Sequence, residues 1–192
     1  MGLISLIVGG AVDAHKAIKQ NQAQKEDGTH HVVVDNRYSI DVPAFLSKRN
    51  DLSEDAAVQY GSNTLDVGFQ VIDEPKDEFL VVMNELEESI PALQDEEKTL
   101  LDKMAVITLG NYFEDMDKVS IEEYTETTIN GLDALIINAF QKRTFFKDAL
   151  YGTFAFIEGK ETMYQIIIVS GGTSITKLAE KLEESIKSFR EL

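Results

Sequence analysis

The 192-residue chain contains no cysteine. It therefore forms no disulfide and has no thiol nucleophile, zinc–thiolate site or lipoprotein attachment residue. Histidine is also scarce, because the chain has only His15, His30 and His31, all near its start. A Ser–His–acid triad needs a positioned histidine, and the sequence has no glycine pattern of a nucleophile elbow. The sequence thus contains no recognisable catalytic motif.

The two adjacent histidines do not form a predicted metal site. His30 and His31 fall in an expected strand, where neighbouring side chains point to opposite faces. One ion cannot easily bind both. An acidic cluster at 114–117 lacks the spacing and the glycine of a calcium loop, and we interpret it as a solvated surface, with weak divalent-ion binding as the alternative. We therefore predict no metal and no cofactor.

Basic residues are few. Eighteen lysines and arginines stand against 34 aspartates and glutamates, which gives a formal net charge of −16. Such a chain repels phosphate backbones unless it carries a local basic patch. The densest basic pairs are Lys48-Arg49 and Lys142-Arg143, so we expect no nucleic-acid partner.

The chain also lacks a hydrophobic run of the roughly 18–20 residues that span a bilayer as a helix. Its most apolar stretch, residues 2–12, has no basic start of the kind that opens a secretory signal. Three interpretations stay open: a helix packed on the domain, an anchor that contacts a membrane or a partner, or a weak export signal. Residues 20–28 are polar and are typical of a linker.

These features predict two parts: an apolar segment with its linker over 1–28, and a folded domain over 29–192. We expect the segment to be dispensable for folding but to contribute to function. A cytoplasmic location is the expectation, with membrane association or export to the periplasm as alternatives.

Alternating and helical periodicities within the domain predict an α+β fold. Asn130-Gly131 is the best hairpin signal, because this pair suits a turn with two positive φ angles. Separate strands with short hairpins predict a largely antiparallel β-sheet packed by helices, an α/β/α sandwich. Strands are expected at 30–35, 38–42, 56–61, 64–73, 121–129, 132–144, 149–157 and 161–169, and helices at 77–90, 95–116 and 173–189.

Four short motifs carry a family resemblance. They are Tyr-Ser-Ile-Asp-Val-Pro at 38–43, Asn-Gly-Leu-Asp-Ala at 130–134, Tyr-Gln-Ile at 164–166 and Ser-Ile-Lys-Ser-Phe at 185–189. Over about 32–189 the sequence resembles the family that includes PsbP of the photosynthetic oxygen-evolving complex, the Ran-binding Mog proteins and bacterial DcrB-like proteins. The resemblance implies a PsbP-like fold and a non-enzymatic binding module. Family members bind a photosystem subunit, a small GTPase or, in the Eag chaperones of type VI secretion, apolar helices of secreted effectors.

The strongest candidate for a partner surface is the expected strand 132–144. Its apolar residues occupy both faces, so one face packs helices and the other needs cover. Lys142 and Arg143 beside two aromatics suggest a contact, although buried core aromatics are the alternative. The predicted partner-binding residues are Leu135, Ile137, Lys142, Arg143, Phe145 and Phe146.

The sequence thus predicts a protein-binding or assembly module, adaptor-like or chaperone-like, that holds a protein or an apolar helix on a sheet face or in a groove. Two alternatives stay open. One is a small-ligand-binding or enzymatic domain with a pocket between sheet and helices. The other is a membrane-associated envelope component tethered by the start of the chain.

Overall fold

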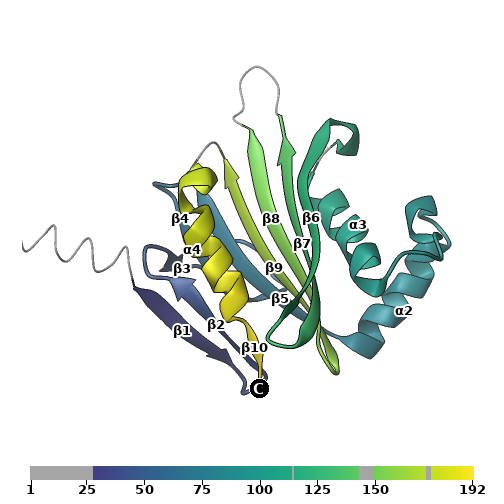
Figure 1. Ribbon diagram of the computed structural model, residues 1–192, viewed down its shortest axis with the longest axis horizontal. Helices are drawn as coiled ribbons and strands as arrows, with labels where there is room; N and C mark the ends of the chain where they lie inside the picture. The colour runs from purple at the N-terminus through teal and green to yellow at the C-terminus, as the bar shows by residue number, and fades with distance from the viewer. Residues whose placement is uncertain (1–27, 114, 143–148, 172–173) are drawn as a thin grey trace, which may run out of the picture.

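The computed structural model describes residues 28–113, 115–142, 149–171 and 174–192. Over these ranges the chain forms two antiparallel sheets and three α-helices, which confirms the predicted α+β class (Figure 1). The larger sheet has the order β3 (Ser47–Lys48), β4 (Ala56–Ser62), β5 (Val67–Pro75), β9 (Thr162–Gly171), β8 (Leu150–Glu158), β7 (Leu132–Gln141) and β6 (Val119–Ile129). The smaller sheet has the order β1 (Thr29–Val34), β2 (Tyr38–Pro43) and β10 (Arg190–Glu191).

The helices cover both faces of the larger sheet. Figure 1 shows α2 (Lys76–Glu87) and α3 (Leu100–Tyr112) on one face, and α4 (Ser174–Ser188) with the smaller sheet on the other. Short 3-10 turns, η1 (Pro91–Leu93) and η2 (Met116–Lys118), flank α3. Within the described ranges no helix is long and apolar enough to cross a membrane.

Two hydrophobic cores lie on either side of the larger sheet. Strand β8 shows why: Phe154 and Phe156 pack beneath α2 and α3, whereas Ala155 and Ile157 pack toward α4. Side chains of a strand alternate between faces, so a strand buried on both faces is apolar throughout. This explains the apolar residues on both faces of β7, which is a central strand of the same sheet.

The Asn130-Gly131 turn forms as predicted. Asn130 has a φ of 50° and Gly131 a φ of 87°, so both central residues adopt the left-handed region. The hairpin between β4 and β5 differs from the prediction, because β5 begins at Val67 rather than at residue 64. Residues 63–66 form its turn, and Asp66 has a positive φ of 50°.

Helices α2 and α3 are shorter than predicted. Thr99 and Asp102 form a capping box that starts α3 at Leu100, rather than at residue 95. Phe113 is extended and buried against Phe154, which ends α3 before the predicted residue 116. Helix α2 ends at Glu87 because Ile90 precedes a proline and is extended, a conformation that proline imposes on the residue before it.

Candidate binding groove

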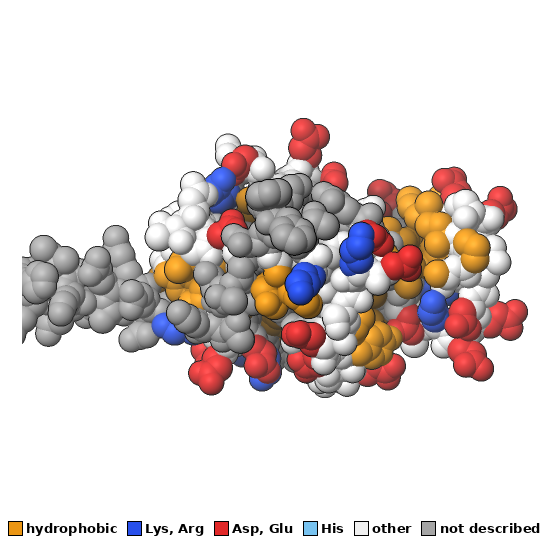
Figure 2. Space-filling view, turned by 90° about the horizontal axis from the view of Figure 1, so that it is seen from above, with side chains coloured by type: hydrophobic (Ala, Val, Ile, Leu, Met, Phe, Trp, Pro, Cys, Tyr) orange, Lys and Arg blue, Asp and Glu red, His pale blue; other side chains and the backbone are white. Residues whose placement is uncertain are grey.

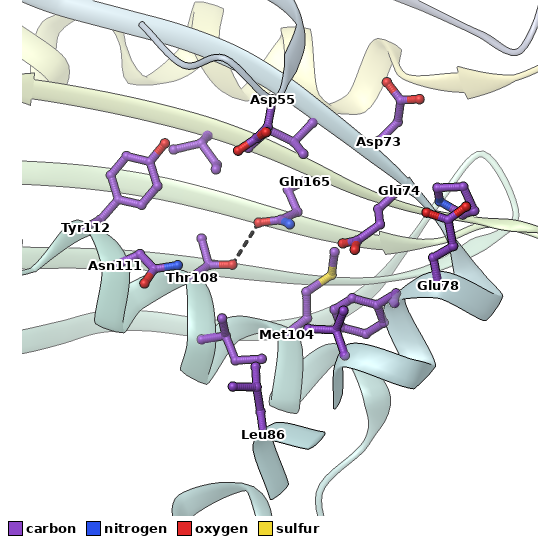
Figure 3. Close-up of a pocket in the computed structure, with 16 residues that line it drawn as sticks. Asp55, Asp73, Glu74, Glu78, Leu86, Met104, Thr108, Asn111, Tyr112 and Gln165 are labelled. Carbon is purple, nitrogen blue, oxygen red and sulfur yellow. Dashed lines mark hydrogen bonds between the residues drawn. The ribbon is translucent and has the colours of Figure 1, made fainter. Parts of the chain in front are cut away.

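A groove with a volume of about 630 Å³ opens between α2, α3 and the sheet face formed by β5 and β9 (Figure 3). Helix α2 forms one wall, α3 forms another, and the sheet face lies between them. Along the chain the segment that contains η1 connects α2 to α3. The apolar lining of the groove comes from α2 (Phe79, Val82, Leu86), α3 (Met104, Ile107) and the two strands (Ile72, Ile167). The groove is therefore a gap in the helical layer over the sheet.

Helix α2 is apolar on more than one side. Phe79 and Met83, four residues apart, are buried against the sheet. Leu80, Val81 and Val82 nevertheless expose 41%, 59% and 44% of their surface. Val82 also lines the groove and Val81 follows it around the helix, so the exposed strip formed by Val81 and Val82 continues into the groove. Leu80 lies about 200° around the helix from Val82 and faces the other flank of α2. Figure 2 shows hydrophobic side chains bordered by acidic ones at this end of the molecule.

Uncharged polar groups occupy the floor of the groove. The hydroxyl of Thr108 on α3 donates a hydrogen bond to Oε1 of Gln165 on β9 over 2.7 Å (Figure 3). The hydroxyl of Tyr112 accepts a hydrogen bond from the side-chain amide of Gln70. Burial raises the pKa of Tyr112, so this hydroxyl stays protonated at neutral pH. These contacts fix α3 on the sheet and hold that side of the groove in place.

Four carboxylates line the groove, and one of them is already neutralised. Asp73 forms an ion pair with Arg37 and accepts a hydrogen bond from the hydroxyl of Tyr38 over 3.2 Å. The other three are Asp55, Glu74 and Glu78. Among the residues that the structure describes, none of these three forms an ion pair.

Glu74 is the groove carboxylate whose ionised form is disfavoured by its surroundings. Burial raises the pKa of its carboxyl, and the negative charges of Glu78 and Asp55 raise it further. Figure 3 shows Asp55 and Glu74 on the strand side and Glu78 near the start of α2. The mouth of the groove is therefore a region of concentrated negative potential beside apolar surface.

The polar side chains that line the groove are carboxylates, amides and hydroxyls. Its described lining residues include no histidine, and the hydroxyl of Thr108 faces an amide rather than a base. Across the described ranges, no three acidic or histidine side chains lie close enough to hold a metal ion. The arrangement can accept apolar side chains and a cationic group.

Two of the predicted partner-binding residues require a correction. Leu135 and Ile137 are 1% and 2% exposed, because α3 and the rings of Phe156 and Phe154 on β8 cover them. They contribute to the core rather than to a surface. Lys142 is exposed just after β7, whereas Arg143, Phe145 and Phe146 lie outside the described residues.

The opposite face of β7 does not need a partner for cover either. Ala134 packs with Leu182 and Ile186 of α4, and with Ile40 of β2. The smaller sheet and α4 thus supply from the same chain the cover that sequence reasoning assigned to another protein. The apolar pattern of a strand indicates that a face is buried, but it does not indicate which element covers that face.

The histidines and the acidic cluster lie apart from the groove. The ring of His30 stacks on Tyr60 with centroids 5.5 Å apart, whereas Nδ1 of His31 lies 2.7 Å from a carboxylate oxygen of Asp41. In the acidic cluster the carboxylate of Asp115 caps η2, so its role there is structural. Among the described residues of these two regions, no three acidic or histidine side chains lie close enough to hold a metal ion.

Sequence reasoning expected a groove or a pocket between sheet and helices, but it assigned none of the residues that line this groove to a binding site. Its carboxylates come from the segment before β4, from the end of β5 and from α2, and Gln165 stands on β9. The available signal was the Leu80-Val81-Val82 run, which gives α2 apolar residues beyond the Phe79 and Met83 stripe.

Comparison with solved structures identifies the fold. No protein-family model matches the sequence, and no curated protein matches it. Cyanobacterial PsbP (CyanoP) from Synechocystis sp. PCC 6803 is similar with a TM-score of 0.56 and 8% identity, over 86% of this chain and 93% of that protein. The Ran-binding protein Mog1p from Saccharomyces cerevisiae is similar with a TM-score of 0.53 and 8% identity, over 85% of this chain and 95% of that protein.

These likenesses establish the architecture that the motifs predicted. The chain has the PsbP-like fold, which Mog1p shares. At 8% identity the likeness concerns the fold alone, and the resemblance to DcrB-like proteins stays a prediction.

Proposed function

We propose that this chain is a non-enzymatic protein-binding module, adaptor-like or chaperone-like, that holds a segment of a partner protein in the groove between α2, α3 and the sheet. The observation that carries the proposal is the strip of Val81 and Val82, which leads from the exposed surface of α2 into the groove. Contiguous exposed apolar surface with a polar rim is a mark of protein interaction sites.

Burial energetics support this use of the strip. Complete burial of a valine or leucine side chain stabilises a complex by about 1.5–3 kcal/mol relative to exposure. The strip and the apolar groove lining lie side by side at Val82, so one bound segment can cover both. Binding of a segment here needs no change in the core beneath α2 and α3.

The structural neighbours add support at the level of class. Mog1p is described as a Ran-binding protein, so this fold serves protein recognition in at least that case. The net charge of −16 disfavours a nucleic-acid partner. A protein partner is therefore the class that we propose.

Photocrosslinking in cells tests the proposal. A benzophenone amino acid is placed on either side of the groove, at Val82 on α2 or at Asn111 on α3, in the full chain. Val33 on β1 and Ile121 on β6 serve as controls, because they are exposed apolar positions away from the groove (48% and 45%). The same adduct from both walls, with none from the controls, is expected. Absence of an adduct from both walls, or equal yields from the controls, would contradict the proposal.

A further inference from the structure

The end of the groove next to β5 holds negative charge that the chain does not neutralise. Within the described part of the chain, Asp55, Glu74 and Glu78 make no ion pair, although Asp73 beside them has Arg37. Arg37 thus shows how a cation is accommodated at this edge of the groove. The other three carboxylates lie where a bound group would meet them.

The position of Glu74 favours binding of a positively charged group from a partner. Its carboxyl is partly buried, and Glu78 and Asp55, which line the groove with it, are both negatively charged. A cation that entered here would be attracted more strongly than at an exposed site, because low-dielectric surroundings strengthen charge interactions. The apolar side chains of Phe79 and Met104 in the helix walls would pack against the alkyl part of the same side chain.

The separation between the groove carboxylates indicates which kind of cation they can bind. The described carboxylates do not converge closely enough for a metal ion. A lysine or arginine side chain has a long apolar stem and several N–H donors, so it can reach separated carboxylates from a segment that lies on the α2 strip.

We propose that the groove selects an amphipathic segment of a partner protein whose apolar residues cover Val81 and Val82, and whose lysine or arginine inserts among Asp55, Glu74 and Glu78. This inference rests on the proposed function and deepens it by naming the chemistry of the partner. Charge complementarity at the mouth of the groove is the observation that commits the site to this occupant.

The test measures binding of a defined probe to the full chain. The probe is a short amidated peptide with leucine and lysine at amphipathic helical spacing, and its binding is followed by calorimetry and amide chemical shifts. Glu74→Gln with Glu78→Gln is compared with Glu122→Gln with Glu126→Gln, which removes the same charge from exposed positions on β6 at the far edge of the sheet. We expect about tenfold weaker binding for the groove variant and little change for the control. Shifts should lie in α2, α3 and β9.

Three outcomes would overturn the inference. Equal weakening in both variants would show general attraction to an acidic protein. Equal affinity for a second peptide with glutamine in place of lysine would show a groove that does not select a cation, and the proposed function would stand. A nitroxide on Ser5→Cys, the only cysteine in that variant, that broadened groove amides would place the start of this chain in the groove instead of a partner.

Failure of the proposed function is recognised separately. It appears as the absence of crosslinks from both walls of the groove, whatever the peptide does. The two results therefore cannot be confused.

Discussion

The side-chain amide of Asn130 donates a hydrogen bond to the main-chain carbonyl of Phe189 over 2.6 Å, and a second to that of Lys187 over 3.1 Å. Asn130 thus does more than allow a positive φ. It connects the β6–β7 turn to the end of α4, where carbonyl groups have lost their helical partners. The turn and the last helix are therefore stabilised together.

The Asn130 contact can be tested apart from the turn itself. Asn130→Gly keeps a residue that accepts a φ of 50° but removes both hydrogen bonds. We expect the free energy of unfolding to fall by about 1 kcal/mol, as measured by denaturant titration. A variant as stable as the wild type would show that the turn alone matters.

Gly131→Val tests the turn. Gly131 has a φ of 87°, and no atom lies within 4 Å of the place that a β-carbon would take. Loss of stability would therefore come from backbone strain and not from a clash, and should amount to about 1–3 kcal/mol. An unchanged melting temperature would mean that the hairpin tolerates another backbone conformation.

Alanine substitutions at two neighbouring positions on α4 should change stability by very different amounts. Leu182 is 2% exposed in the core under α4, so Leu182→Ala should cost about 2–5 kcal/mol of unfolding free energy through lost burial and a cavity. Glu183 is exposed and forms an exposed ion pair with Lys187 on the same helix, so Glu183→Ala should change stability little. Equal losses in thermal unfolding would be incompatible with the helix phase.

Acid titration of stability tests the environment of Glu74. A carboxyl with a raised pKa in the folded chain binds its proton more tightly there than in the unfolded chain. The free energy of unfolding therefore falls as pH rises from the ordinary value of 4.5 through the folded-state pKa. Glu74→Gln removes this dependence, so the variant should be the more stable protein at neutral pH and should lose its advantage below pH 4.5. Parallel pH profiles for the two proteins would contradict the assignment.

A polar substitution in the strip on α2 should weaken partner binding without lowering thermal stability. Val81 is 59% exposed and lies within a helix, where lysine is the better helix former. Val81→Lys should therefore leave thermal stability equal or slightly higher, while binding of a partner at the groove weakens. A clear drop in melting temperature would assign Val81 to the core instead.

The sequence predicted the parts of the molecule that depend on local chemistry. Asn130-Gly131 specified its turn, and runs of apolar residues specified the buried strands β8 and β9, because turn φ angles and apolar runs are properties of adjacent residues. Helix ends were less accurate: Thr99 caps α3 through a residue three positions later, and this local signal was overlooked.

The groove depends on relations that no local pattern contains. Thr108 and Gln165 are 57 residues apart and meet only because α3 crosses β9. Leu135 and Ile137 were assigned to a surface because their pattern shows burial without showing that α3 supplies the cover. The exposure of Leu80, Val81 and Val82 likewise appears only once α2 is placed on the sheet.

Crosslinking from Val82 in cells, with Asn111 as the facing position and Val33 as the control, tests the central claim that this groove holds a partner protein. The account predicts one adduct that Val82 and Asn111 share, that Val33 does not give, and that fades when Val81→Lys is introduced into the same chain. An adduct that Val33 gives equally, or that persists undiminished with Val81→Lys, would contradict it.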